Sequence, residues 1–380
     1  MNTVQNTPPT VPQTEGIKYA GSKLKLLPHI LRLARTTGAK TVLDGFSGTT
    51  RVSQAFAKSG YAVVANDVAV WSQVFGECFL RARKSRAHYE SLISHLNNTP
   101  PADGWFTEHY GGCVDSAIGA DGLKKPWQQH NTRKLDGIRM EIEKLKLNKT
   151  DRAVALTGLI LAMDKVDNTL GHYAAYLGRW SARSYHPLLL TVPDTSAAGG
   201  EHRVLCGDIF SALPRTDADL AYYDPPYGSN NHKMPASRVR YAAYYHVWKS
   251  ICLFDRPPLF GRAKRRADTS DRAAASPFED FRRDDGGRFV AAQALEDLVR
   301  ETPARWIILS YSSGGRAADE LRKVLSRHGQ LHEEVAVDYR RNVMAEMTWT
   351  GKWTPDCPGE HREFLFLLEK EGGKTKQQAV

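Results

Sequence analysis

The sequence predicts an α/β protein with a large sheet-based core and a second, smaller helical lobe. Three observations support this fold class. A strand, a glycine turn, a helix and a second strand follow one another between residues 41 and 67. Two later strand patterns, near residues 204 and 220, again end in aspartate, whereas the stretches 70–96, 134–147 and 152–166 have helical patterns. With 380 residues, the chain is long enough for one large core and a further lobe.

The remaining elements follow from local patterns of apolar residues and of turn residues. The first unit comprises a strand (41–44), a tight turn (45–49), a helix (50–59) and a strand (61–65). Helices are then expected at 70–96, as one long helix or two broken ones, and at 134–147 and 152–166. Later elements are strands 204–210 and 220–223, a helix at 241–254, a strand at 305–311, a helix at 316–328, and an antiparallel pair, 331–338 with 363–368.

Composition narrows the class of partner. The chain has 52 Lys and Arg against 42 Asp and Glu, a net charge of +10. This excess indicates a polyanionic partner without choosing between DNA, RNA and a membrane surface. No apolar run approaches the length of a membrane span, and residues 1–14 lack an apolar signal core, so we expect a cytoplasmic protein. The five cysteines are isolated, which predicts reduced thiols and no metal site.

The most informative motif is Asp224-Pro225-Pro226-Tyr227, directly after the strand at 220–223. The exocyclic amino nitrogen of adenine or cytosine is a poor nucleophile because its lone pair is delocalised into the ring. A carboxylate and a backbone carbonyl that accept its two hydrogens localise that lone pair. The prolines fix the backbone without adding N–H donors, and the tyrosine offers a face on which an extruded base can stack. A proline-rich turn capped by an aromatic residue is the alternative interpretation.

Four acids are expected along one edge of the sheet. Asp44 ends the first strand of the pattern, and Asp67, Asp208 and Asp224 end three later ones. Ligands of open α/β sheets bind outside the carboxyl ends of the strands. The turn after Asp44 has only Gly45 and Gly48, so it serves a pyrophosphate poorly, and Asp44 suits a cationic ligand such as the ammonium group of S-adenosylmethionine. A purely structural turn in another doubly wound protein is the alternative.

In combination, these motifs resemble the Dam-like DNA adenine N6-methyltransferases in their α arrangement. The segment Lys18-Tyr19-Ala20-Gly21-Ser22-Lys23 comes first, followed by the loop Asp44-Gly45-Phe46-Ser47-Gly48, Asp67, Asp208 and Asp224-Pro225-Pro226-Tyr227. The resemblance covers roughly residues 16 to 370. It implies a Rossmann-like, mostly parallel seven-stranded sheet with a helical target-recognition insertion, S-adenosylmethionine as methyl donor, and double-stranded DNA as substrate.

The resemblance also implies roles for individual residues. Tyr19, Lys23, Asp44, Phe46 and Gly48 would line the donor pocket, Asp67 would hold the ribose, and Asp208 would hold the donor's adenine amino group. Asp224, Pro225, Pro226 and Tyr227 would hold the target base. The family loop usually ends Gly-x-Gly, whereas this chain has Gly48-Thr49-Thr50. A β-branched residue allows less close approach of the backbone, which bears on donor affinity and not on donor identity.

Two basic, aromatic stretches are candidates for DNA contact. The predicted contacts in the insertion are Lys165, Asn168, His172, Tyr173, Arg179 and Arg183, and those after the tetrapeptide are Asn230, Arg238, Arg240 and Arg265. For any one of the residues in the insertion, a solvated basic face is an equally good interpretation, and for 257–285 the alternative is a disordered basic loop.

The expected domain organisation follows from these assignments. It consists of a disordered leader (1–15), a catalytic domain (16–75 and 200–370), a target-recognition lobe (76–199), a basic DNA-contacting insertion (228–290) and a tail (371–380). A cognate restriction endonuclease is a candidate partner, and we expect a monomer or weak dimer. The rival functions are a cytosine N4-methyltransferase, more often with serine at position 224, and an RNA or protein-glutamine methyltransferase, more often with asparagine there. A catalytically silent DNA-binding subunit is a further alternative.

Overall fold

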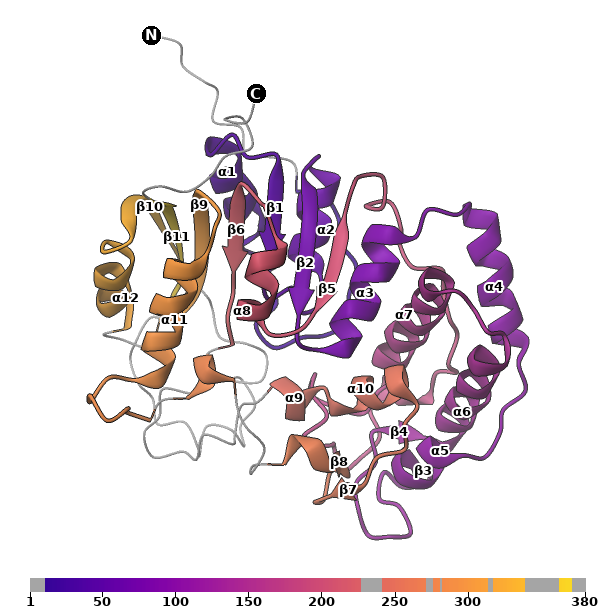
Figure 1. The fold of residues 1–380 in the computed structure, drawn as a ribbon. Helices are drawn as coiled ribbons and strands as arrows, with labels where there is room; N and C mark the ends of the chain where they lie inside the picture. Colours follow the sequence, from indigo (N-terminus) through magenta and orange to yellow (C-terminus); the bar gives the residue numbers. More distant parts are fainter. Residues whose placement is uncertain are drawn as a thin grey trace.

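The computed structural model describes residues 11–226, 241–270, 276–280, 282–313, 317–338 and 362–370. Its centre is a mixed, mostly parallel sheet in the order β10-β11-β9-β6-β1-β2-β5 (Figure 1). The strands are β1 (Thr41–Asp44), β2 (Ala62–Asp67), β5 (Arg203–Cys206), β6 (Leu220–Tyr223), β9 (Trp306–Ser313), β10 (Gly329–Asp338) and β11 (Arg362–Lys370). Only β11 runs antiparallel to its neighbours in this sheet of described residues. The predicted seven strands and the closing antiparallel pair are confirmed.

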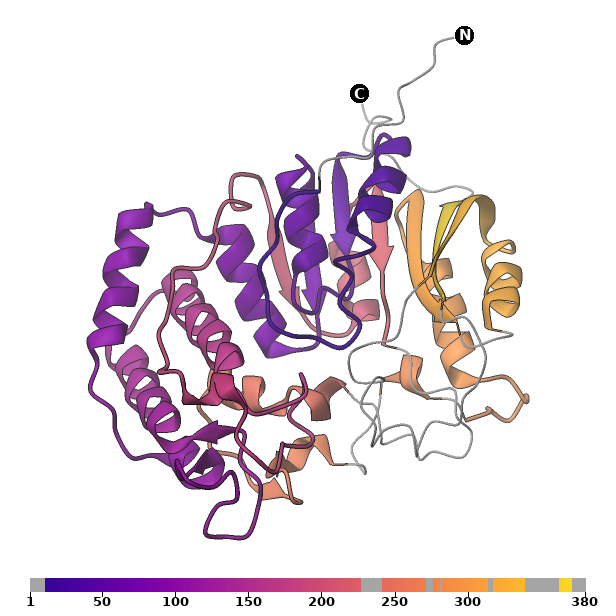
Figure 2. The same cartoon turned by 180° about the vertical axis from the view of Figure 1, so that it is seen from behind.

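Helices cover both faces of the sheet. Alternate residues of β6 face opposite sides, so Leu220 and Tyr222 join one core and Ala221 and Tyr223 the other. One face is covered by α8 (Ile209–Ala212), α11 (Val290–Glu301) and α12 (Ala317–Leu325), and Figure 2 shows α1 (Leu27–Thr36) and α2 (Arg51–Lys58) in front of the opposite face.

The helical lobe lies beyond the β5 edge and is inserted between β2 and β5 (Figure 1). Its helices are α4 (Arg86–Asn98), α5 (Trp105–Tyr110), α6 (Gln129–Lys144) and α7 (Lys149–Lys165). The stretch predicted at 70–96 is two helices, because α3 (Val70–Arg81) ends at a four-residue turn before α4. α7 is the central helix, since every residue from Ala153 to Met163 is buried. Two short strand pairs, β3 (Gly111–Gly112) with β4 (Trp127–Gln128) and β7 (Leu259–Phe260) with β8 (Arg265–Arg266), complete the lobe.

A second chain segment completes the core of this lobe. Helices α9 (Tyr241–Tyr244) and α10 (His246–Leu253) follow the tetrapeptide, and residues such as Tyr245, Trp248 and Ile251 join the same apolar cluster as α3, α6 and α7. The helix predicted at 241–254 therefore exists as two helices that pack into the lobe. Among the described residues, no helix combines the length and apolar character that crossing a bilayer requires.

Candidate functional site: an acidic cavity at the carboxyl edge of the sheet

The four predicted acids line one cavity of about 420 Å³ at the carboxyl edge of the sheet. Asp44 and Asp67 are the last residues of β1 and β2, and Asp224 follows β6 directly. Asp208 lies two residues beyond β5, because residues 209 and 210 begin helix α8 instead of extending the predicted strand. The chain order reverses between β1 and β6, so the cavity lies at the topological switch point of the sheet, where ligands of this architecture bind.

Asp44 lies at the bottom of this cavity with no exposed surface. Its Oδ2 accepts a 2.6 Å hydrogen bond from Ser53, and its Oδ1 has no hydrogen-bond partner among the described residues. Burial raises the pKa of Asp44 to about 7, Ser53 opposes this rise, and the negative charges of Asp67 and Asp224 add to it. A cationic ligand would satisfy the open oxygen and the uncompensated charge together.

Asp67 shapes the glycine loop that forms one wall of the cavity. Its two oxygens accept hydrogen bonds from the backbone N–H groups of Gly48, at 2.8 Å, and Ala69, at 2.9 Å. Each oxygen keeps a lone pair for a ligand hydroxyl. Gly48 has φ +46°, and Thr50, where the family pattern has glycine, has φ +61°. Thr50, which departs from the family pattern, therefore has a left-handed backbone conformation. This conformation is unfavourable for a β-branched residue.

Lys23 and Tyr19 bring the first motif into the same cavity. The Tyr19 ring stacks on Tyr245, with centroids 4.7 Å apart, and lies 5.4 Å from the ring of Tyr241. The Lys23 ammonium lies 3.1 Å from Asp224 Oδ1 and 3.5 Å from Glu363 Oε1. The sequence placed Lys23 in the donor wall, whereas the structure pairs it directly with the first residue of the tetrapeptide.

An aromatic wall that the sequence did not reveal closes another side of the cavity. The ring of Phe278 meets Phe46 edge to face, with centroids 5.3 Å apart, and stacks on Phe210 at 6.1 Å. Phe46 was predicted from the glycine loop, but Phe278 belongs to the short 3₁₀ turn Pro277–Glu279, far along the chain. No motif surrounds Phe278, so only its position in the folded protein identifies it.

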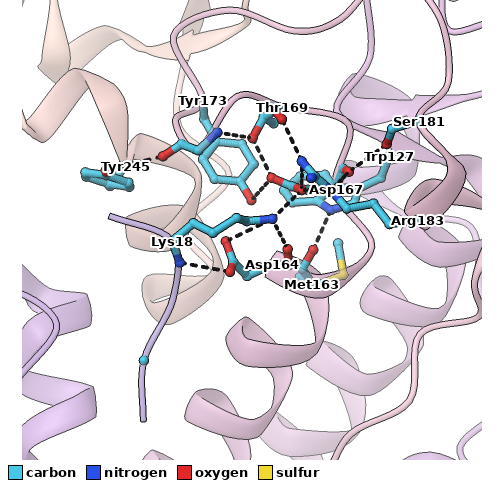
Figure 3. A network of polar contacts seen from close by, with 12 residues as sticks. Lys18, Trp127, Met163, Asp164, Asp167, Thr169, Tyr173, Ser181, Arg183 and Tyr245 are labelled. Carbon is cyan, nitrogen blue, oxygen red and sulfur yellow. Dashed lines mark hydrogen bonds and ion pairs between the residues drawn. The ribbon is translucent and has the colours of Figure 1, made fainter. Parts of the chain in front are cut away.

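A buried polar network fixes the first motif to the helical lobe (Figure 3). The Lys18 ammonium contacts Asp167 Oδ1 at 2.7 Å and the carbonyl oxygen of Asp164 at 2.5 Å. The Lys18 backbone N–H donates to Asp164 Oδ2 at 3.0 Å. Arg183 approaches Asp167 from the other side and also donates to the carbonyl of Thr169. The segment carrying Tyr19 and the end of α7 are therefore held as one unit.

The lobe residues predicted to contact DNA divide into surface and interior positions. Asn168 and Tyr173 have at most 1% of their surface exposed, and their contact with DNA stays a prediction. Asn168 Oδ1 instead accepts a hydrogen bond from the backbone N–H of Ser181. His172 is half-buried and stacks on Tyr244, whereas Lys165 and Arg179 are exposed. The sequence alone did not separate surface residues from interior ones, because it does not show that Asn168 has a hydrogen-bond partner inside the fold.

The basic stretch after the tetrapeptide contains one structural arginine. Arg266 is 3% exposed and forms a two-pronged pair with Asp255, both distances 2.7 Å, and a further contact with Asp268 at 3.1 Å. Arg265, the predicted DNA contact, is half-buried with its guanidinium 4.6 Å from the centre of the Phe260 ring, and Arg262 is exposed. Among the described residues of this stretch, the arginines therefore differ in exposure, from the buried Arg266 to the exposed Arg262.

Replacing Arg266 with methionine is expected to lower the free energy of unfolding by about 2–4 kcal/mol. Removal of the guanidinium leaves Asp255 without its ion-pair partner and Asp268 with Lys249 alone, and the partial exposure of both carboxylates keeps the cost below that of a fully buried pair. Chemical denaturation measures this change, with Arg262→Met as the exposed control, expected within about 0.5 kcal/mol of the wild type. Equal, small losses for both variants would contradict the structural role of Arg266.

Four predicted site residues lie outside the described residues: Tyr227, Asn230, Arg238 and Arg240. Pro225 is buried and Pro226 lines the cavity beside Asp224. No group of three His, Cys, Asp or Glu side chains in the described ranges is arranged to hold a metal ion.

Comparison of the whole sequence with known proteins finds one family and several relatives that are similar to this chain. The sequence model of the D12 class N6 adenine-specific DNA methyltransferases matches residues 19–247. The chain is 25% identical over 364 residues to the type II methyltransferase M.NlaIII of Neisseria lactamica, covering 93% of this chain and 99% of that protein. It is 23% identical over 385 residues to the type II methyltransferase M2.HphI of Haemophilus parahaemolyticus, covering 94% and 98%. With the modification methylase StsI of Streptococcus sanguinis the identity is 28% over 321 residues, covering 80% of this chain and 45% of the relative.

Proposed function

Because this chain belongs to the D12 class of N6 adenine-specific DNA methyltransferases, we propose that it methylates a flipped-out adenine at a specific site in duplex DNA, with S-adenosylmethionine as donor. The observation that carries the donor assignment is the open, buried oxygen of Asp44 in a cavity at the switch point of the sheet. This oxygen suits an ammonium group, and the half-buried Asp67 suits the hydroxyl groups of a ribose.

The donor supplies a methyl group bonded to a positively charged sulfur atom, so no nucleophile of the protein and no metal is required for activation. The protein's contribution is then positioning and electrostatics. Asp224 and the carbonyl of Pro225 accept the two hydrogens of the adenine amino group, which frees the nitrogen lone pair. Tyr227 offers its ring to the extruded base, a role that rests on the resemblance alone.

We assign target recognition to the helical lobe and phosphate contact to exposed cations such as Lys165, Arg179 and Arg262. The names of the relatives support a place in a type II modification system, with a cognate restriction endonuclease as partner. A Rossmann-like donor fold, a cytoplasmic location and a monomer or weak dimer complete the proposal.

The decisive experiment digests DNA from an expressing host to nucleosides and separates them by chromatography. N6-methyladenine alone is expected, and modification-aware sequencing of the same DNA should place it in one short motif. A dominant N4-methylcytosine peak would falsify the adenine assignment and leave the fold and the donor intact. Methylation spread over unrelated sequences would contradict site specificity.

A further inference from the structure

Glu363 is a buried acid beside the tetrapeptide that no motif of the sequence indicated. It lies at the start of β11, and because β11 runs antiparallel, its first residues lie at the edge where β6 ends and Asp224 begins. Its Oε1 is 3.5 Å from the Lys23 ammonium, and its Oε2 has no hydrogen-bond partner within the described part of the chain. Glu363 and Lys23 are 6% and 5% exposed.

We propose that Glu363 is a positioning residue for methyl transfer that acts through Lys23 on Asp224. The Lys23 ammonium is shared between two carboxylates, at 3.1 Å from Asp224 and 3.5 Å from Glu363. With one ammonium and two carboxylates, these three side chains have a formal charge of −1 when all are ionised. Without Glu363, the ammonium and Asp224 form a neutral pair, and Asp224 is a weaker acceptor for the amino hydrogens.

This inference rests on the proposed function, because the negative charge of Glu363 matters only if a positive charge develops on an amino nitrogen during methylation. The amino nitrogen donates its lone pair to the methyl carbon, and the carbon–sulfur bonding pair leaves with sulfur. The nitrogen is then positively charged until one of its hydrogens departs as a proton to water. A negative cluster next to that nitrogen stabilises the charge as it develops, and the low exposure of the cluster limits screening by water.

Structural stability alone is a poor explanation for this cluster. Taking an ammonium and a carboxylate out of water costs several kcal/mol for each ion, and an apolar pair of similar volume is often as stable. Burial raises the pKa of Glu363, Lys23 lowers it and Asp224 raises it further. Tyr19, Tyr222, Tyr241 and Asp44 are further ionisable groups among the described residues that interact electrostatically with members of this cluster.

The test compares Glu363→Gln with the wild type in single-turnover methylation at saturating donor and DNA. We expect the rate constant to fall by about tenfold to hundredfold, the range typical of losing an outer partner of a functional group. The Kd for S-adenosylmethionine, from calorimetry, should stay within about twofold. Glu369→Gln is the matched control on the same strand, since Glu369 pairs with Arg305 and His332 at the far end of β11 and should leave the rate unchanged.

The pH dependence separates a positioning role from a structural one. In acid, Glu363 of the wild type becomes protonated and resembles glutamine, so the ratio of wild-type to variant rates should shrink towards one as the pH falls. Glu363→Asp keeps the charge and should recover most of the rate. Should the glutamine variant fail to fold, Glu363→Asp against Glu363→Asn gives the same comparison at constant size.

Three outcomes overturn the proposal: an unchanged rate in Glu363→Gln, a rate ratio independent of pH, or a weakened donor Kd that accounts for the whole loss. Failure of the proposed function gives a different result, since the wild type itself would then not methylate DNA.

Discussion

Replacing Asp224 with alanine is expected to lower the methyl-transfer rate by at least about hundredfold, the cost of losing one preorganised group at a reacting centre. The side chain accepts a hydrogen of the target amino group, so its loss leaves the nitrogen lone pair delocalised. Donor binding should stay within about tenfold, because Asp224 lies at the β6 end of the cavity and Asp44 and Asp67 remain. Single-turnover methylation and calorimetry measure the two quantities.

Folding is not the cause of the expected loss, because Lys23 keeps Glu363 as a partner when Asp224 is removed. Asp224→Asn separates charge from hydrogen bonding, since it keeps one acceptor oxygen and removes the negative charge. Near-normal turnover in Asp224→Ala would remove Asp224 from the mechanism.

Replacing Asp44 with alanine is expected to weaken S-adenosylmethionine binding by about 1–3 kcal/mol, because a charge-assisted hydrogen bond is lost. The matched control is Asp219→Asn. Asp219 is a buried aspartate at the opposite end of the same strands, where it accepts from the backbone N–H groups of Lys40 and Thr41. That variant should lower stability and leave the donor Kd unchanged. Equal affinities for Asp44→Ala and wild type would place the donor elsewhere.

The raised pKa of Asp44 predicts the direction in which donor affinity and stability change with pH. A carboxyl group with a pKa of about 7 is ionised above that pH and neutral below it. Affinity for a cationic donor should therefore fall as the pH drops through 7, approaching tenfold per pH unit, and Asp44→Asn should show a flat profile. In the unliganded protein the folded state binds the proton more tightly than the unfolded state. The contribution of Asp44 to stability should therefore decrease as the pH rises from about 4 to 7.

The sequence was sufficient for those parts of the site that strand ends and turns determine. Asp44, Asp67 and Asp224 were predictable because a parallel strand, its acidic end and the glycine or proline turn are contiguous in the chain. The helical lobe was predictable from the apolar periodicity of α6 and the buried α7.

The sequence was insufficient where distant segments or internal partners decide the outcome. Phe278 reaches the cavity through a short turn, and Glu363 reaches Lys23 through β11, and neither segment carries a motif. Asn168 and Arg266 belong to basic, polar stretches that resemble a DNA-binding surface, but tertiary packing buries both. Composition counts these side chains as available, whereas Asp255 already pairs with Arg266 and the backbone N–H of Ser181 already donates to Asn168.

The two-part core of the helical lobe determines how this protein can be recombined with its relatives. Chimeras that exchange only the insertion between β2 and β5 would pack a foreign α7 against the native α10. The side chains of the apolar cluster would then come from two proteins and would not be complementary in shape. A graft that also carries residues 241–263 moves this core except for Ile17 and Tyr19 of the first motif region. The same arrangement delays maturation on the ribosome, because the lobe lacks part of its interior until the chain has passed the tetrapeptide.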